Sequence, residues 1–349
     1  MKTKKQIPDF LHLGQKLLYW YNINGRDLPF RKTKDPYKIW ICEIIFQQTR
    51  IEKGMTHYHN FIERFPTVEC LYKADVDEVL LYWKGLGYYS RAINLHKTSV
   101  IIVEKYKGIF PKNYSEILLL PGIGKYTAAA ICSICYGENY PSIDGNFYRV
   151  LSRLLGDGFD ISNHNSFQYF ASLATKLMPI EESGKFNQAM MDLGATVCKV
   201  KNPNCKDCPF SNDCIAFLSD KIHSYPVKSK KTKIINEELE YYFIHHGQQL
   251  LIEQRDDKGI WKKLFQLPTD LPANFAMEII SSEKINHNLT HRRLSITIHE
   301  VQIDSAQTFV EINEWYQSKI ISNNEISKYS FPKPLDKYLK TRLLPPKKD

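Results

Sequence analysis

Four cysteines near the middle of the chain have the residue type and spacing of a metal centre. They fall within seventeen residues and are separated by loops of six, two and five residues: Cys198, Cys205, Cys208 and Cys214. Thiolates held together by loops this short can surround either one zinc ion or one iron–sulfur cluster. Three lysines on the same loops could present positive charge to phosphate groups. The spacing predicts a metal site without distinguishing the metal.

Two carboxylic acids occur in settings that suit acid–base chemistry. Glu43 is the one acid among seven apolar residues between Ile39 and Phe46, and burial there would raise its pKa toward that of a general acid. The alternative is that Glu43, Gln47 and Arg50 form a solvated stripe on one helix face. Asp144 precedes a Gly-Asn pair and could equally be a helix cap.

A turn with two glycines lies between two predicted helices. Gly122 and Gly124 follow Pro121, and Lys125 comes next. Glycines at such a turn let backbone N–H groups approach an anion at the N-terminus of the following helix. This arrangement, a helix-hairpin-helix, binds DNA phosphates without selecting a sequence. A generic turn between helices is the structural alternative.

These residues depend on helices for their positions, and the first 225 residues are predicted to be helical. Asp35-Pro36 has the pattern of an N-cap followed by proline at the first helical position, and it predicts a helix through Arg50. Apolar spacing predicts further helices over 126–135, 166–178 and 185–198.

The second part of the chain has the pattern of a sheet. Residues 239–246 and 249–254 predict a hairpin through Gly247. A further strand is indicated by the alternation of Leu294, Ile296 and Ile298, and a final helix is predicted over 334–343. Between the two parts, residues 221–235 contain five lysines, one proline and no acid, which is typical of an exposed linker.

Charge is distributed unevenly along the 349 residues. The net charge is +9, but residues 1–235 hold 32 Lys+Arg and 22 Asp+Glu, whereas the remainder holds 15 and 16. A basic excess of this kind indicates a polyanionic partner such as nucleic acid, with solubility as the alternative. The 43% hydrophobic content excludes a mainly disordered chain, and no apolar run is long enough to span a membrane. Pro8 and Asp9 interrupt the Lys-rich start, so we expect no secretory signal and a cytoplasmic protein.

The order of these features resembles the helix-hairpin-helix DNA glycosylases that carry a 4Fe–4S cluster, most closely the MutY-type adenine DNA glycosylases. The resemblance covers residues 25–214. The stretches that carry it are Leu28–Arg31, Cys42–Arg50, Gly85–Arg91, Leu120–Ile131, Asp144–Val150 and Phe186–Cys198. It implies one 4Fe–4S cluster on the four cysteines and a monovalent cation at the hairpin.

The resemblance also implies a domain organisation. The mostly α catalytic part would occupy residues 1–225, with a six-helix barrel that contains the hairpin over about 29–135. A 4Fe–4S helical domain would combine 1–28 with 136–225. A basic linker over 226–236 would lead to an α+β, Nudix-like lesion-recognition domain over 237–349, which lacks the Nudix catalytic box and would therefore bind without hydrolysing.

In this family Glu43 would be the general acid that protonates adenine, and Asp144 would stabilise the sugar cation with Tyr126 nearby. Related endonuclease III-like lyases need a lysine nucleophile where this chain has Tyr126. Thymine-mismatch glycosylases also carry tyrosine there, but Glu43 and the C-terminal lobe argue against them. A DNA-binding module without enzymatic activity is the remaining alternative, and it predicts that both acids are dispensable.

The resemblance assigns further residues to DNA contacts. The adenine pocket would contain Arg26, Leu28, Phe30, Arg31 and Gln188. The residues at the opened duplex would be Gln48, Thr49, Leu86, Tyr88 and Asn146, and the backbone contacts would come from Gly122, Gly124 and Lys125. The 8-oxoguanine contacts would come from Thr290 and His291. The family more often has Trp at Phe30, Leu at Phe46 and Phe at Leu289, so the packing of both pockets is expected to differ.

The expected partner is double-stranded DNA containing adenine opposite 8-oxoguanine or guanine, bound by a monomer associated with the nucleoid. The basic excess lies in the part assigned to DNA binding. The near-neutral C-terminal lobe is therefore expected to contribute discrimination more than phosphate affinity.

Overall fold

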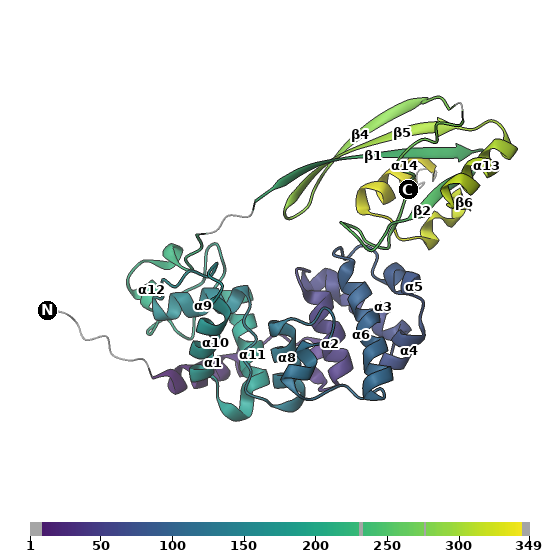
Figure 1. Cartoon of the computed structure of the whole chain (residues 1–349). Coiled ribbons are helices and arrows are strands. Elements are labelled where there is room, and N and C mark those ends of the chain that lie inside the picture. Colours follow the sequence, from purple (N-terminus) through teal and green to yellow (C-terminus); the bar gives the residue numbers. More distant parts are fainter. Residues whose placement is uncertain (1–8, 230–232, 276, 344–349) are drawn as a thin grey trace. The chain divides into compact units, whose positions relative to one another are not determined.

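The computed structural model describes residues 9–229, 233–275 and 277–343, and these pack as two compact units (Figure 1). The first unit comprises residues up to Tyr72 together with those from Lys97 to the linker. The second comprises Lys73–His96 and the C-terminal part of the chain. Within the described residues, no helix is long and apolar enough to cross a membrane.

The first unit is helical, as predicted. Its helices are α1 (Phe10–Asn24), α2 (Pro36–Phe46), α3 (Ile51–Arg64), α4 (Val68–Lys73), α6 (Ser90–Tyr106), α7 (Tyr114–Leu118), α8 (Lys125–Tyr136), α9 (Gly145–Leu155), α10 (Ser166–Leu177), α11 (Ser183–Asp192) and α12 (Ile215–Leu218). Two of them, α4 and α6, are shared with the second unit. Short 3₁₀ turns cover Pro29–Lys32, Ile180–Glu182 and Ile222–Ser224, and a π-helical turn, Leu193–Val197, continues α11.

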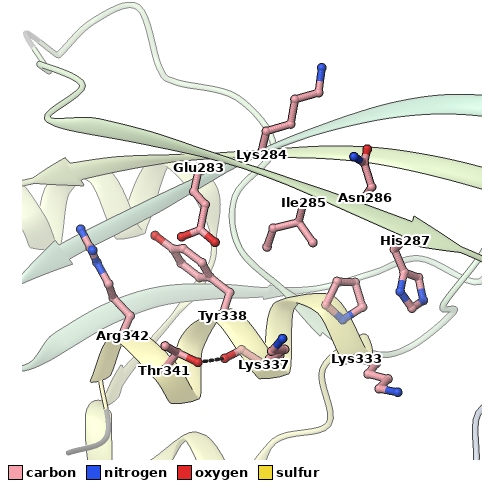
Figure 2. Close-up of a pocket in the computed structure, with 11 residues that line it drawn as sticks. Glu283, Lys284, Ile285, Asn286, His287, Lys333, Lys337, Tyr338, Thr341 and Arg342 are labelled. Carbon is pink, nitrogen blue, oxygen red and sulfur yellow. Dashed lines mark hydrogen bonds between the residues drawn. The ribbon is translucent and has the colours of Figure 1, made fainter.

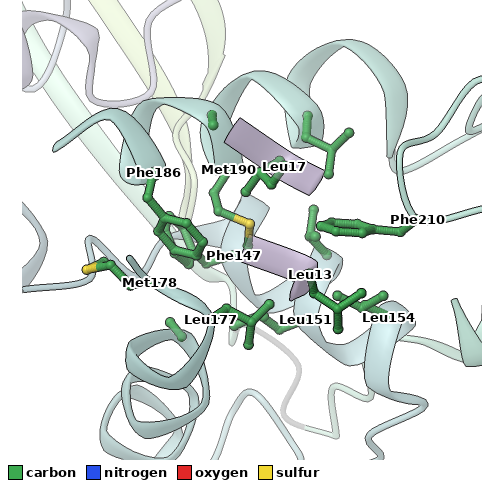
Figure 3. Close-up of a cluster of buried hydrophobic side chains, with 14 of the residues drawn as sticks. Leu13, Leu17, Phe147, Leu151, Leu154, Leu177, Met178, Phe186, Met190 and Phe210 are labelled. Atoms are coloured by element: carbon green, nitrogen blue, oxygen red, sulfur yellow. The ribbon is translucent and has the colours of Figure 1, made fainter. Parts of the chain in front are cut away.

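A single apolar cluster joins α1, α9, α10 and α11. Figure 3 shows Leu13 and Leu17 of α1 meeting Phe147, Leu151 and Leu154 of α9, together with residues of α10 and α11. Phe210, from the cysteine loop, is 2% exposed and inserts into the same cluster. The loop that carries the cysteines is therefore anchored on the core that positions α9.

The second unit contains a six-stranded sheet. Its strands are β1 (Ile235–His246), β2 (Gln249–Gln254), β3 (Phe265–Gln266), β4 (Ser281–Asn288), β5 (Arg292–Gln302) and β6 (Lys319–Ser322). The order is β3-β2-β1-β5-β4, with β6 also paired to β2. β1 and β5 are parallel from Ile235↔Arg292 to His245↔Gln302, and every other pair is antiparallel.

Each face of this sheet is covered by a helix. Alternate residues of β1 point to opposite faces, as strand geometry requires. Tyr241 and Phe243 pack in a cluster with α14 (Lys333–Leu343), whereas Ile244 packs in a cluster with α13 (Ala306–Tyr316). A 3₁₀ helix, Asn323–Lys328, precedes α14. The predicted mostly α part followed by an α+β lobe is confirmed.

The residues between 73 and 96 contribute α5 (Val76–Tyr82), a glycine turn and the start of α6. In the turn, Gly85 and Gly87 have φ of 92° and 74°, and Tyr88 has φ of 49°. A left-handed conformation is unusual for a bulky residue and often marks a functional position.

Two predicted element bounds are wrong. The helix expected to reach Arg50 ends at Phe46, because Gln48 adopts a left-handed φ of 55° and breaks the helical path. The linker expected over 226–236 ends earlier, since Ile235 and Asn236 already pair with β5. Linker residues 230–232 lie outside the described part, as do 1–8, where the Lys-rich start falls. The other predicted helices and the hairpin agree with the structure to within a few residues.

Close packing of α1 on α10 generates a stability prediction. A Cβ added to Gly14 would lie 1.8 Å from the carbonyl oxygen of Leu177, a backbone atom that cannot move aside cheaply. We expect Gly14→Ala to lower the free energy of unfolding by about 3 kcal/mol, at the upper end of overpacking costs, as measured by urea titration. Gly158→Ala is the matched control, because nothing lies within 4 Å of its added Cβ. Equal stability of the two variants would contradict this packing.

Candidate active site and DNA-binding surfaces

Glu43 lies inside the first unit and contacts Tyr126. It is on α2 between the buried residues Cys42 and Ile44, and its carboxyl interacts electrostatically with Tyr126 at the start of α8. The Tyr126 hydroxyl also lies 3.5 Å from the Met191 sulfur. Burial raises the pKa of Glu43 to about 7, although Tyr126 and the nearby Arg31 cation act in the opposite direction. The predicted effect of burial on Glu43 is thus confirmed, and the solvated stripe is excluded because the helix ends before Gln47.

Asp144 is the N-cap of α9. One carboxylate oxygen accepts the backbone N–H groups of Asn146 at 2.8 Å and Phe147 at 2.9 Å, and the other accepts the Asn146 side-chain amide at 2.7 Å. The cap predicted from sequence is therefore present. It does not exclude chemistry, because Asp144 also acts electrostatically on Glu43 and Tyr126. The structure brings the three predicted catalytic residues into one electrostatic environment.

The two carboxyls differ in their surroundings. Burial raises the pKa of Asp144 as well as that of Glu43. At Asp144, three hydrogen bonds from Phe147 and Asn146 and the Arg149 cation oppose burial by stabilising the carboxylate. What distinguishes Asp144 is the set of donors supplied by its own helix.

The predicted adenine-pocket arginines converge on a buried acid that was not predicted. Asp192, at the end of α11, is fully buried and accepts hydrogen bonds from Arg26 and from both terminal nitrogens of Arg31, the latter at 2.7 Å each. These paired cations hold the pKa of Asp192 below its usual value despite burial. Gln188, one turn earlier, accepts the Tyr21 hydroxyl at 3.0 Å.

Two of the three predicted departures from the family pattern, Phe30 and Phe46, pack against each other. Phe30 lies 4.9 Å from Phe46 between ring centroids and 6.1 Å from Tyr58. The Phe46 ring also covers Gly54, where an added Cβ would approach it to 2.5 Å. The extra ring at position 46 thus packs beside the smaller ring at position 30. Leu28, which precedes Phe30, is half-buried.

The hairpin residues form a helix N-terminus open to an anion. Gly122 has φ of 76°, and Gly124 caps α8 without a side-chain hydrogen bond and with nothing within 4 Å of an added Cβ. The Lys125 ammonium lies 5.0 Å from the centre of the Phe167 ring. Backbone N–H groups at such a terminus can bind phosphate.

The four cysteines all line one small pocket of the first unit, with Arg153 beside them. Arg153 donates to the Cys198 sulfur at 3.4 Å, and its carbonyl lies 3.3 Å from the Cys214 sulfur. Within the described part of the chain, no group of three or more His, Cys, Asp or Glu side chains has the geometry of a single-ion site. Four thiols around one pocket are nevertheless the donor set that a 4Fe–4S cluster requires.

Arg149 connects this cysteine loop to Asp144. Its guanidinium donates to the Cys198 carbonyl at 2.6 Å and to the Gly194 carbonyl and the Asn146 side-chain oxygen at 2.8 and 2.7 Å. The Asn146 amide nitrogen in turn donates to Asp144. A continuous hydrogen-bonded path therefore runs from the cysteine loop to the N-cap of α9.

A separate pocket of about 470 Å³ belongs to the second unit. It is lined by the glycine turn at Gly87–Ser90 and by residues 287–291, which include Thr290 and His291. The hydroxyls of Tyr88 and Thr290 are hydrogen bonded at 2.5 Å, and the Tyr88 ring is about half exposed. The structure thus brings together Tyr88, Thr290 and His291, which were predicted separately. Leu86, two residues before Tyr88, is buried.

The remaining predicted residues lie at the surface of the first unit. Gln48 is exposed, and the Thr49 hydroxyl donates to the Gln47 carbonyl at 3.3 Å. The Gln47 side chain donates to Thr127, next to Tyr126, at 3.3 Å.

Comparison with known proteins identifies the family. A family model described as the HhH-GPD superfamily of base excision DNA repair proteins matches residues 41–173, and a NUDIX domain model matches residues 241–341. Adenine DNA glycosylase of Buchnera aphidicola subsp. Schizaphis graminum is 35% identical over 93% of this chain and 97% of its own length. The chain belongs to the adenine DNA glycosylase family.

Further similarities agree with this assignment. The same enzyme of Buchnera aphidicola subsp. Acyrthosiphon pisum is 38% identical over 81% of each chain. The solved structure of a thermostable thymine-DNA glycosylase is 29% identical, covers 60% of this chain and 97% of its own, and has a TM-score of 0.56. This member of the adenine DNA glycosylase family therefore combines a base-excision-repair glycosylase fold with a Nudix-like domain.

Three buried charges of this family member were not predicted from its sequence. Asp192 is a single acid within an apolar helical run, which is the signal that identified Glu43. Arg149 and Arg153 are spaced four residues apart on the otherwise apolar face of α9, and both are buried. In each case the signal in the sequence is the position of the charge on the apolar side of an amphipathic helix.

The buried charges generate the second prediction. Asp192→Asn keeps the side-chain shape but leaves Arg26 and Arg31 without a counter-charge, which should cost about 3–5 kcal/mol of unfolding free energy in a urea titration. Asp213→Asn is the control, because Asp213 pairs with Lys16 at 2.8 Å and both side chains are about one-third exposed. That surface pair should contribute less than about 1 kcal/mol. A small effect of Asp192→Asn would mean that the arginines do not depend on it.

Proposed function

We propose that this chain removes adenine mispaired with 8-oxoguanine or guanine in duplex DNA, by hydrolysing the N-glycosidic bond without cutting the strand. The observation that carries the proposal is Glu43, a carboxyl on α2 with a pKa of about 7 that interacts with both Tyr126 and Asp144. A carboxyl that can be neutral near physiological pH next to a hydrogen-bonded carboxylate is the pair that glycosidic cleavage needs.

The reaction begins when adenine leaves the base stack, because its glycosidic bond is shielded in the duplex. Neutral Glu43 donates its proton to N7 of adenine. The C1′–N9 bond then breaks, its electron pair goes to N9, and an oxocarbenium-like cation forms at C1′. The Asp144 carboxylate stabilises that cation. Ionised Glu43 takes a proton from water while the water oxygen bonds to C1′, which yields free adenine and an abasic sugar.

Several contacts support this assignment of roles. The Tyr126 phenol interacts with the Glu43 carboxyl, and burial raises the pKa of that phenol well above its usual value, so it remains neutral. A lyase would require an amine at this place. The neighbouring amine, that of Lys125, lies over the Phe167 ring. The absence of an amine at position 126 supports a hydrolase that leaves the strand intact.

The adenine base would be held by Arg26, Arg31 and Gln188 against the ring of Phe30, with Leu28 beside it. Asp192 fixes both guanidinium groups, so their positions are set before the base arrives. Arg31 also acts electrostatically on Glu43, which connects this group with the acid. Such preorganisation lowers the cost of orienting the substrate.

The other DNA contacts follow from local geometry. Backbone N–H groups at Gly122–Lys125 would bind a phosphate, with a monovalent cation at the same turn. Tyr88 would wedge the stack and Gln48 and Thr49 would contact the opened duplex, since an aromatic ring can stack on any base. Thr290 and His291 would bind 8-oxoguanine through a hydroxyl and an imidazole.

We further propose that Cys198, Cys205, Cys208 and Cys214 hold one 4Fe–4S cluster. When bound, the cluster would cross-link the loop through four iron–sulfur bonds. Arg149 and Arg153 bind this loop through its backbone and would keep its position relative to α9. A brown protein with an iron–sulfur charge-transfer absorption, rather than bound zinc, would test the assignment.

The third prediction tests the reaction itself. A duplex labelled on the adenine strand and containing A:8-oxoguanine should break at the adenine only after alkali treatment. Because Glu43 must be protonated to act, the single-turnover rate should fall about tenfold per pH unit above about pH 7.

Glu43→Gln should lose at least about 10²-fold in rate, because an amide cannot deliver the proton. Thymine paired with guanine serves as the control substrate. Absence of any break would contradict the proposal, and a break without alkali would indicate a lyase.

The fourth prediction concerns the opposite base. Thr290→Val keeps the shape of the side chain but removes the hydroxyl, and it should lower the rate ratio of A:8-oxoguanine to A:G by about 5–10-fold, the value of one hydrogen bond. Thr308→Val, on α13 of the same unit, should leave that ratio unchanged. The ratio is measured by single-turnover excision on both duplexes. An unchanged ratio in Thr290→Val would exclude this contact.

A further inference from the structure

A large pocket of about 720 Å³ lies between β4 and α14, and none of the residues assigned to the reaction or to base recognition lines it (Figure 2). β4 contributes Glu283 to His287, and α14 contributes residues from Lys333 to Arg342. Side chains of β4 alternate, so Glu283, Ile285 and His287 point toward α14, whereas Lys284 and Asn286 point away from it. The pocket therefore has a helical wall that is mostly basic and a strand wall that contains one acid.

The two ends of this pocket differ in charge balance. At one end, Glu283 and Arg342 interact electrostatically, and Arg342 also pairs with Glu300. At the other end, the helix presents Lys333 and Lys337, which lie one turn apart on the same face. Among the described residues, neither lysine has a carboxylate within ion-pair distance. Unbalanced positive charge is thus confined to one end.

The paired cations of the same helix provide a contrast. Lys340, on α14, is bonded to Asp336 at 2.7 Å, and Asp336 is also 2.9 Å from Lys84. Neither Lys340 nor Asp336 lines the pocket. The uncompensated lysines are therefore the ones that face the open volume, which is the arrangement expected of a site for an anion.

The basic end adjoins the pocket that contains Tyr88 and Thr290. His287 and Lys333 line both pockets, so the two volumes share a wall. Burial, followed by the nearby Lys333 cation, lowers the pKa of His287, so its imidazole is neutral and has one N–H to donate. An anion at this end would meet two ammonium groups and one imidazole.

We infer that His287, Lys333 and Lys337 bind backbone phosphates of the strand that carries the base recognised at Thr290. The inference rests on the proposed function for the identity of that base. DNA is favoured over a small anion because the basic end opens directly onto the pocket assigned to a base, and a base in that pocket is attached to a chain of phosphates.

Chain geometry sets how far from that base the phosphates lie. His287 is three positions before Thr290, a span of at most about 10 Å in an extended chain. One strand of B-form DNA advances about 3.4 Å per nucleotide along the helix axis. The phosphates bound here should thus lie within about three nucleotides of the recognised base. A lobe with a net charge near zero would in this way make localised contacts to the backbone.

The fifth prediction tests this site by the salt dependence of binding. The probe is a fluorescent duplex with 8-oxoguanine opposite 2′-fluoro-deoxyadenosine, which resists hydrolysis. Each lysine–phosphate interaction that a substitution removes should reduce the slope of log Kd against log salt by about 1. We expect a slope reduction of about 1 for Lys333→Ala and for Lys337→Ala and of about 2 for the double variant. Lys340→Ala, with its cation already paired, should retain the wild-type slope.

Neutral methylphosphonates identify the strand. Placed within three nucleotides of 8-oxoguanine on its own strand, they should reduce the wild-type slope but have no further effect on the double variant.

An unchanged slope in the double variant would overturn the site, as would an equal slope reduction in Lys340→Ala. If only methylphosphonates on the adenine strand abolished the difference between wild type and the double variant, the strand assignment would be wrong. Failure of wild-type protein to release adenine, with these slope changes present, would refute the proposed function and leave phosphate binding intact.

Discussion

Buried guanidinium groups need hydrogen-bond acceptors, and this requirement determines how the segments at the centre of the first unit are arranged. Arg149 and Arg153 project from α9 into the protein, and every donor that is withdrawn from water must find an oxygen or sulfur partner. Arg149 donates hydrogen bonds to the carbonyls of Gly145, Gly194 and Cys198. Arg153 donates to those of Lys199, Val200, Ile222 and Tyr225. The π-helical turn, the start of the cysteine loop and residues 222–225 are thereby fixed to a helix that is capped by Asp144.

Close approach of the backbone makes this arrangement possible. Gly194 lies in a π-helical turn against Asn146, and an added Cβ there would meet the Asn146 side chain at 2.5 Å. Because Asn146 must donate to Asp144 while accepting from Arg149, its side chain has one usable orientation. The environment of the Asp144 carboxylate is thus determined by neighbouring residues that orient it, as supporting contacts around a reactive group do.

Local sequence patterns predicted the elements and the individual reactive groups, but not their partners. The apolar run around Glu43 was sufficient to predict burial and its effect on the pKa of Glu43, and glycine spacing predicted the hairpin. By contrast, the partners of Arg26 and Arg31 lie more than 160 residues away at Asp192, and no periodicity reveals a contact between distant segments. The early end of α2 was missed for a different reason, since neither Pro nor Gly marks the turn that Gln48 forms by a left-handed conformation. Apart from the end of the linker, the proposed domain bounds remain predictions, while the packing groups residues 73–96 with the C-terminal lobe.

Helix α8 begins at the turn proposed to bind phosphate, and its second residue, Tyr126, interacts with Glu43. Lys125 begins the helix and Tyr126 follows, so only about 1.5 Å of helical rise separates them. Under the proposed function, a phosphate held by the hairpin is therefore at a fixed distance from the proton that Glu43 delivers. The fixed spacing along the helix would therefore set the register of the bound strand. The nucleotide at that distance from the phosphate is the one presented for reaction. Its neighbours along the strand lie at other distances and are excluded before any base is recognised.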